Sequence, residues 1–345
     1  MKVAISIEHP AWIHQFRQII LRLQKEGHEV LILAIDKDGD IELLEKFGLD
    51  YELVGNSTGK NVFDKAWLLF SITFKMWLKC RKFKPDVFIG RASPMLAMNA
   101  AIAGKPHLIF EDTERSTISL KFCQWFSKEI ITPTTFRTNL GPKQKRMPTY
   151  KELFYLHPDY FQPDRQVIRD MGIKDDERFV FIRFVSWNAS HDIGFKGYSE
   201  AAKRELVEAI LPHAKVLISS EEKLADDLAV YQVKVPFEKI HHVLYYASAY
   251  VGEGATMASE AAVLGTHAIF VSQLTAGSLD EQEKAFDLVF NADGDDRFDR
   301  TRERTLEWLG DPQLEEKGRE KRKKLLQEKT DINGLFIQKI ESYTK

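Results

Sequence analysis

Cysteine is scarce in this chain, with two residues, Cys80 and Cys123, among 345. Two cysteines are too few for a disulfide framework or a cysteine-rich metal site, and they fit a reducing cytoplasm. A surplus of charge is also missing: the formal net charge is −2, which gives no case for a nucleic-acid partner. No uncharged apolar run reaches the ~20 residues of a membrane span, and an apolar strand begins at Lys2. We therefore expect a cytoplasmic protein without a signal peptide.

The apolar pattern indicates an α/β chain. Residues 3–7 form a continuous apolar run, residues 12–23 repeat apolar side chains at helical spacing, and residues 28–34 form a second run. This succession of strand, helix and strand is typical of the opening of a doubly wound domain. Its first turn has no glycine cluster, which excludes a dinucleotide fingerprint there. The same rhythm restarts after the proline-punctuated segment 157–164, which we interpret as a linker between two domains.

The stretch from Gly252 to Gly265 carries the strongest functional signal. Gly252 and Gly254 follow a predicted buried strand and precede a short, alanine-rich helix, so the backbone can approach a ligand closely. The start of that helix directs free N–H groups and the positive end of its dipole at the same place. Thr256 and Glu260 share one helix face, because they are four residues apart. We place on the other, packed face Met257, Ala261 and Leu264. The pattern predicts a phosphate site with a carboxylate one turn further on, placed to accept hydrogen bonds from two vicinal hydroxyls. The alternative is an ordinary strand–turn–helix with Glu260 solvated at the helix edge.

This stretch resembles the donor-site motif of GT-B glycosyltransferases. It is most similar to that of the lipid-linked N-acetylglucosamine transferase of peptidoglycan synthesis, with its Gly-Ala turn and its Ser-Glu pair. UDP-N-acetylglucosamine 2-epimerases carry a related version, and His267 stands here where proline is usual. The resemblance implies that Glu260 binds the nucleotide ribose and that no metal or cofactor is required. The residues it assigns to the nucleotide-sugar site are Gly252, Gly254, Ala255, Thr256, Ser259 and Glu260.

The resemblance also implies the fold and its division. We expect a GT-B-like α/β protein with two Rossmann-like, doubly wound domains that face a central crevice. Residues 1–158 would form the N-terminal, acceptor-side domain, and residues 165–325 the C-terminal domain that holds the nucleotide sugar. Residues 326–345 would form a helix that crosses back to the N-terminal domain.

Three residues at predicted strand ends are candidates for acid/base chemistry: His9, Glu111 and His191. The carboxyl ends of parallel strands carry the ligands in doubly wound sheets. Similarity to the epimerases implies a glutamate near the sugar at Glu111 and a histidine in the loop 186–197 at His191. That loop also holds Ser190, which suits phosphate or sugar contacts. The epimerases' arginines are missing here, and Glu111 could instead precede a helix that is simply capped by Asp112 or Thr113.

The segment before the donor motif, residues 235–247, resembles the GT-B segment that contacts the nucleotide base. Phe237 or Ile240 would then lie against a uracil ring, and Gln282 or Gln273 would contact the donor sugar. Within this segment lies a histidine pair, residues 241–242. Adjacent helical residues point about 100° apart, so the pair is poorly placed to chelate a metal.

Residues 62–84 combine aromatic and basic side chains. Residues 62–79 predict a helix rich in Trp and Phe, and the basic residues cluster near its end. Such a helix can lie in a membrane interface, so peripheral membrane contact through residues 62–84 is one interpretation. The other, which we prefer on sequence alone, is a core helix whose basic end complements its dipole.

Together these patterns predict an enzyme that binds a UDP-linked nucleotide sugar and transfers the sugar to a glycan or lipid-linked acceptor. Two alternatives stay open. A sugar-nucleotide 2-epimerase would need two acid/base groups around the second carbon of the sugar and no acceptor. A non-catalytic protein that binds a sugar nucleotide or a polysaccharide would keep only the binding residues.

Overall fold

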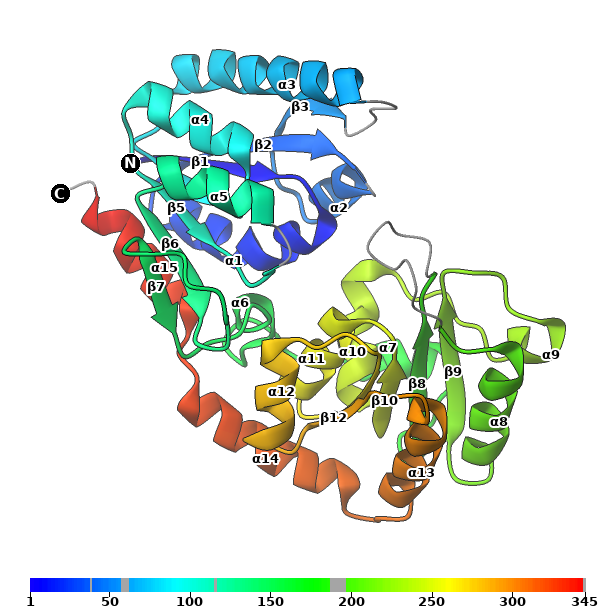
Figure 1. Cartoon of the computed structure of the whole chain (residues 1–345). Helices are drawn as coiled ribbons and strands as arrows, with labels where there is room; N and C mark the ends of the chain where they lie inside the picture. Colours follow the sequence, from blue (N-terminus) through cyan, green and yellow to red (C-terminus); the bar gives the residue numbers. More distant parts are fainter. Residues whose placement is uncertain (38, 57–61, 115–116, 187–196, 344–345) are drawn as a thin grey trace. The chain divides into compact units, whose positions relative to one another are not determined.

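A computed structural model describes residues 1–37, 39–56, 62–114, 117–186 and 197–343 (Figure 1). The chain divides into two compact units. The first unit contains Met1–Tyr160 together with Thr330–Lys345, and the second contains Phe161–Lys329. None of the helices in the described residues combines the length and apolarity that a bilayer crossing requires.

The first unit is built on a seven-stranded parallel sheet in the order β3-β2-β1-β4-β5-β6-β7. Its strands are β1 (Lys2–Ile7), β2 (Glu29–Asp36), β3 (Glu52–Asn56), β4 (Val87–Gly90), β5 (His107–Phe110), β6 (Glu129–Pro133) and β7 (Gln144–Met147). The inner strand β1 pairs with β2 on one side and β4 on the other, with Ala4 opposite Leu31 and Phe88. The inner strands read as continuous apolar runs because helices cover both faces of such a sheet.

The helices of this unit are α1 (Pro10–Lys25), α2 (Asp40–Lys46), α3 (Val62–Phe83), α4 (Pro94–Ala103), α5 (Thr117–Phe126), α6 (Leu153–Leu156) and α15 (Ile332–Ser342). Helix α4 packs against both α3 and α5, so these three form one layer (Figure 1). The start of α4, the middle helix of this layer, is fixed by its N-cap: the Ser93 hydroxyl accepts a hydrogen bond from the Leu96 N–H at 3.2 Å.

The second unit holds a five-stranded parallel sheet in the order β12-β11-β10-β8-β9. Its strands are β8 (Phe179–Phe184), β9 (Lys215–Ser220), β10 (Ala249–Gly252), β11 (His267–Val271) and β12 (Val289–Ala292). Its helices are α7 (Gln166–Asp170), α8 (Glu200–Ile210), α9 (Asp226–Ala229), the short 3₁₀ helix η1 (Phe237–Lys239), α10 (Ile240–Tyr246), α11 (Ala255–Val263), α12 (Gly277–Lys284), α13 (Arg297–Leu309) and α14 (Leu314–Glu328).

Two local features differ from what the sequence pattern indicates. The basic, turn-rich residues 139–151 have the composition of a loop but contain the edge strand β7, which pairs with β6 from Gln144 to Met147. Its polar sequence has no apolar alternation, and only the backbone hydrogen bonds of the sheet reveal it. Met257, expected on the packed face of its helix, is only half-buried, while buried side chains begin at Ala258.

Each sheet has one point where its winding reverses. In the first unit the chain lays β2 and β3 on one side of β1 and the later strands on the other, so the reversal lies between β1 and β4. In the second unit it lies between β8 and β10. Loops leave in opposite directions at such a point, and ligands of doubly wound sheets bind there at the carboxyl ends of the strands.

Candidate functional site

The glycine turn of the second unit lies at its winding reversal, where β10 ends and α11 begins. Gly252 and Gly254 have different structural roles. A Cβ atom at position 252 would collide with the Tyr250 hydroxyl, so packing alone requires glycine at this position. A Cβ atom at Gly254 would meet nothing closer than a Val185 methyl at 4.0 Å. Gly254 is the N-cap of α11, and among the residues that the structure describes no side chain caps the amides of its first turn.

Glu260 is buried one turn into α11. Its carboxylate Oε1 lies 3.1 Å from Nε2 of His241 on α10, and only 8% of Glu260 is exposed. The alternative that placed Glu260 in solvent at the helix edge is therefore wrong. A buried carboxylate is stable only with hydrogen-bond partners, and His241 supplies one of them. Sequence reasoning considered His241 only as a metal ligand and missed this pairing.

The adjacent histidines point to separate partners. Nδ1 of His242 accepts a hydrogen bond from the Asp164 N–H at 2.9 Å, while its ring lies 4.9 Å from the Phe161 ring, centroid to centroid. Burial lowers the pKa of His242, so this ring is held neutral at physiological pH. The divergence of the two side chains follows from their adjacent positions on α10.

Three further residues predicted to contact the nucleotide sugar lie near this turn: Ser259 on α11, Gln282 on α12 and Gln273 after β11. Ser259 is buried, and its hydroxyl accepts a hydrogen bond from Nε2 of Gln282 at 2.9 Å. That bond joins α12 to α11 inside the unit. Gln273, the other glutamine candidate, is exposed just after β11. Of the two glutamines, Gln273 is therefore the one open to a ligand, and Gln282 is the one that positions Ser259.

Glu253 holds the flanks of the loop that follows β8. Its two carboxylate oxygens each accept a hydrogen bond at 3.1 Å, one from the Val185 N–H and one from the Tyr198 N–H. At the end of β9, Glu221 accepts two hydrogen bonds of 3.0 Å from Ser186. The loop thus begins and ends at the carboxyl edge of the sheet. The predicted residues Ser190 and His191 lie outside the described residues.

The two hydrogen bonds by which Glu253 holds Val185 and Tyr198 were not predicted. The available signal was an acidic residue between two glycines at a strand end. Glutamate is almost never fully buried unless it is paired, so a glutamate at the end of a buried strand indicates a hydrogen-bonding role.

Phe237, predicted to contact the base, lies in η1 with 65% of its surface exposed. An exposed aromatic ring beside the donor segment offers a stacking surface.

In the first unit, His9 lies between β1 and α1, next to Glu8, and caps α1. Its Nδ1 accepts a hydrogen bond from the Ala11 N–H at 3.2 Å, and the residue is exposed. Because Nδ1 is occupied as an acceptor, the neutral ring carries its proton on Nε2.

Glu111 lies at the end of β5 in a buried ion pair with Arg91, which follows β4. The Glu111 carboxylate also accepts hydrogen bonds from the backbone N–H groups of Ala92 and Thr113, at 3.2 and 3.0 Å. Arg91 reaches Gln15 of α1 as well, at 3.2 Å. The catalytic role of Glu111 stays a prediction. Its contacts give it a second role, since they hold the Arg91 guanidinium across the ends of β4 and β5.

Asp112 extends this cluster. It pairs with Arg91, and its other oxygen lies 3.2 Å from the Lys151 ammonium. Burial raises the pKa of Asp112, but the charges of Arg91 and Lys151 outweigh burial and hold that pKa well below its usual range. Asp112 is therefore ionised at neutral pH and serves as a counter-ion to Arg91 and Lys151.

Glu8, which follows β1, is a further acid/base candidate that was not predicted from the sequence. Burial raises the pKa of Glu8, against the opposing effect of Ser93 and Ser6 nearby. Its buried Oε1 has no hydrogen-bond partner among the residues that the structure describes. A carboxyl group with a raised pKa at the winding reversal is suited to proton transfer. The signal was an acidic residue directly after the first strand.

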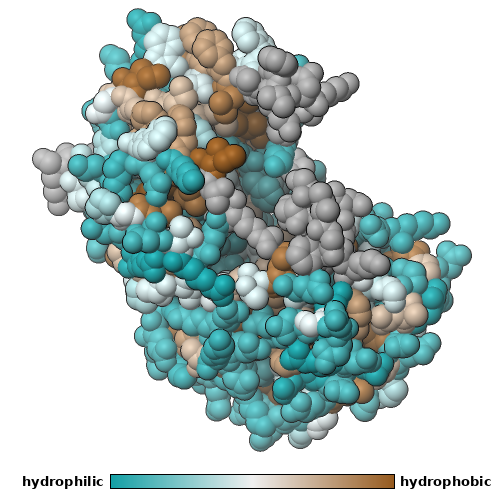
Figure 2. All heavy atoms as spheres, viewed as in Figure 1, coloured by the Kyte–Doolittle hydropathy of each residue, from teal (hydrophilic) through white to brown (hydrophobic). Residues whose placement is uncertain are grey.

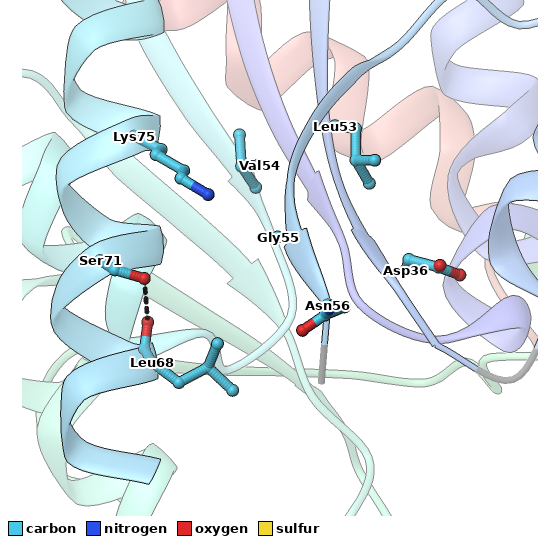
Figure 3. A pocket seen from close by; sticks show the side chains of 8 residues that line it. All are labelled: Asp36, Leu53, Val54, Gly55, Asn56, Leu68, Ser71 and Lys75. Carbon is cyan, nitrogen blue, oxygen red and sulfur yellow. Dashed lines mark hydrogen bonds between the residues drawn. The ribbon is translucent and has the colours of Figure 1, made fainter. Parts of the chain in front are cut away.

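A cavity of about 310 Å³ opens beside α3, at the carboxyl ends of β2 and β3 (Figure 3). Its walls mix polar and apolar groups. They are formed by Asp36, Leu53, Val54, Gly55, Asn56, Leu68, Ser71 and Lys75. The side chains of Ser71 and Lys75 approach it from the helix, and Asp36 and Asn56 from the strand ends. Such a mixture suits a small polar ligand.

Comparison with known proteins places the chain in a family. Residues 1–297 match the family described as "Protein of unknown function (DUF354)", and the chain belongs to it. An uncharacterised protein of Methanocaldococcus jannaschii is 24% identical over 275 residues, which cover 77% of this chain and 80% of that protein.

Solved structures identify the fold. UDP-GlcNAc 2-epimerase from Neisseria meningitidis, bound to UDP-GlcNAc, aligns with a TM-score of 0.68 at 12% identity, over 92% of this chain and 94% of that one. UDP-GlcNAc 2-epimerase from Methanocaldococcus jannaschii aligns with a TM-score of 0.66 at 12% identity, over 89% and 93%. The glycosyltransferase VinC, in complex with dTDP, aligns with a TM-score of 0.65 at 13% identity, over the full length of both chains. The predicted fold class, two parallel-sheet Rossmann-like units as in GT-B glycosyltransferases and these epimerases, is confirmed.

Proposed function

We propose that this member of the family is an enzyme that binds a nucleotide sugar of the UDP type in its second unit. One combination of features supports this most: the uncapped start of α11 at Gly254, next to a buried Glu260 held by His241. In the proposal, the α11 amides hold the phosphates and Glu260 accepts hydrogen bonds from the ribose hydroxyls. The exposed ring of Phe237 stacks on the base.

The reaction that we favour is transfer of the sugar to a glycan or lipid-linked acceptor, as in polysaccharide biosynthesis. The acceptor hydroxyl attacks the anomeric carbon, and the bond from that carbon to the diphosphate oxygen breaks. The leaving diphosphate gains charge, which the N-terminus of α11 stabilises. The cavity beside α3, with Asp36 and Asn56 at its strand ends, is our proposed acceptor pocket.

Proton transfer in this reaction needs an acid or a base. His9, Glu111 and His191 are the groups proposed from the sequence, and Glu8 joins them because burial raises its pKa. The tautomer of His9 keeps a proton on Nε2, so the neutral ring is suited to donate a hydrogen bond there. The raised pKa of Glu8 makes that carboxyl group suited to proton transfer.

The similarity of the fold to UDP-GlcNAc 2-epimerases supports a second reaction, epimerisation at the second carbon of the sugar. It needs a proton to leave that carbon and another to return, and no acceptor. A protein that only binds a sugar nucleotide would retain the α11 site and need none of the acid/base groups.

Nucleotide binding is tested by thermal shift with UDP, dTDP, GDP, ADP and CMP. Wild type is compared with Glu260→Ala and with Glu303→Ala, which removes an exposed glutamate of α13 in the same unit. A ligand at one hundred times its Kd stabilises by about 2.7 kcal/mol. We expect a UDP-selective shift that is kept in Glu303→Ala and lost in Glu260→Ala. A chain that responds to no nucleotide would contradict the proposal.

The two reactions are separated by proton NMR of a UDP-sugar with the protein in D₂O. Epimerisation exchanges the hydrogen at the second carbon with solvent deuterium and needs no added acceptor. Transfer leaves that hydrogen in place and releases UDP only with an acceptor. Binding without either change would leave the non-catalytic alternative.

A further inference from the structure

Helix α3 has two unlike faces. Ile72, Met76 and Cys80 are buried in the core of the first unit. On the opposite face, Trp67 is 71% exposed and Phe70 is 63% exposed. The core-helix interpretation therefore accounts for only one side of α3, and the aromatic residues of the other side need a separate explanation.

The apolar face extends over the whole helical layer. Along α3 it follows helical spacing through Trp67, Phe70, Phe74 and Leu78, all of them exposed. On α5, which packs on the other side of α4 in the same layer, Ile118 and Trp125 are 84% and 75% exposed. We call these six residues the α3–α5 face. Figure 2 shows apolar residues gathered over this part of the molecule. Exposed apolar area of this kind marks a binding surface in a folded protein.

Basic residues outnumber acidic ones along α3 and its C-terminal end, although Lys79 pairs with Glu52 on β3 at 2.7 Å. Residues 62–84 contain six Lys or Arg and one Asp, in a chain whose formal net charge is −2. Lys75, Arg81, Lys82 and Lys84 are exposed. The Arg81 guanidinium lies over the Trp77 ring, 5.3 Å from its centroid. Aromatic rings bordered by basic side chains are the arrangement that binds the headgroup region of an anionic bilayer.

We propose that the α3–α5 face docks the first unit on an anionic membrane surface, with α3 lying in the plane of the interface. The aromatic and aliphatic side chains would enter the headgroup region, while the basic groups contact anionic lipid headgroups. A second copy of the chain fits less well. A symmetric dimer through this face would bring its basic residues against the same residues of the other copy.

The docking requires only the first unit and does not depend on the proposed sugar chemistry. Each basic residue close to an anionic surface raises the binding constant on the order of fivefold. Binding must therefore need anionic lipid and weaken as salt rises.

The test is co-sedimentation of the full chain with vesicles of phosphatidylcholine alone and of phosphatidylcholine mixed with phosphatidylglycerol. Wild type is compared with the double variant Trp67→Ser/Phe70→Ser and the charge variant Lys82→Ser/Lys84→Ser. The matched control is Val230→Ser, because Val230 is 75% exposed and lies in the second unit. We expect wild type and the control to bind the anionic vesicles only, and both patch variants to bind at least tenfold more weakly.

Circular dichroism and the nucleotide thermal shift of each variant establish that the fold and the second unit are intact. Wild type that binds neither vesicle, or patch variants that bind as well as wild type, would overturn the proposal. So would light scattering that shows a wild-type dimer dissociated by Trp67→Ser/Phe70→Ser, because the face would then serve a second copy. Failure of nucleotide binding in wild type would leave the vesicle result unaffected.

Discussion

Replacement of Arg91 by methionine should destabilise the first unit severely. Arg91 is 5% exposed and its partner Glu111 is 3% exposed, so the pair is screened from water. Removal of the guanidinium leaves the Glu111 charge buried, with the backbone N–H groups of Ala92, Asp112 and Thr113 as remaining donors. Breaking a buried pair from one side costs about 3–5 kcal/mol, most of it from the uncompensated charge.

The neighbouring carboxylate limits that cost. Asp112 loses Arg91 in the variant but keeps Lys151, whose ammonium lies 3.2 Å away. We therefore expect a loss near the lower end of the range, about 3 kcal/mol. The double variant Arg91→Met/Glu111→Gln removes the buried charge together with its partner. It should recover at least ~1 kcal/mol relative to the single variant, because neutral amides are cheaper to bury.

The assay is urea unfolding, followed by circular dichroism and by a probe placed in the first unit, since two units need not unfold together. If Arg91→Met costs less than ~1 kcal/mol, the pair behaves like an exposed salt bridge and the reasoning fails. If the double variant recovers nothing, the loss comes from packing and not from the stranded charge.

The pH dependence gives an independent check. The pKa of Asp112 is lower in the folded protein than its ordinary value, so its pairing contributes stability that is complete above a pH of about 4. That contribution is lost as pH falls through the folded pKa, because the unfolded chain then binds more protons. Arg91→Met should flatten this acid loss of stability in urea titrations repeated across acidic pH.

Three further predictions concern the second unit. Gly252→Ala should cost roughly 1–3 kcal/mol in urea unfolding, because its Cβ would collide with Tyr250, whereas Gly254→Ala should leave stability within about 0.5 kcal/mol. Equal losses in both would refute the packing role of Gly252. Phe237→Ala should weaken nucleotide binding by roughly 1–3 kcal/mol in calorimetry without changing stability, since the ring is 65% exposed. An unchanged Kd would remove Phe237 from the site. His241→Ala should weaken nucleotide binding and also destabilise the unit by roughly 1–3 kcal/mol, because it removes a hydrogen-bond partner of the buried Glu260 carboxylate. Full binding with normal stability would show that this pairing does not position the carboxylate.

Local sequence determined the elements that build both sheets. Helix α4 begins after Ser93 and ends at Ala103, before Gly104, as its cap residue and its terminal glycine predict. The strand–turn–helix from β10 to α11 was likewise readable, because glycines, small residues and an apolar run act over a few neighbours. Sequence order alone also placed polar residues after β1 and β5, which the first sheet brings to one edge, and after β10, at the corresponding edge of the second sheet.

Tertiary structure alone decided which of those polar groups are paired. Arg91 and Glu111 are 20 residues apart, and Glu260 and His241 are 19 apart, so no local pattern records either contact. The face of α3 was undecided for the same reason. The sequence of an aromatic helix is the same whether its rings are buried or exposed. Only the tertiary structure, in which α4 packs against one side of α3, shows that Trp67 and Phe70 remain at the surface. The burial of a side chain depends on how the layers pack together, so it cannot be predicted from composition.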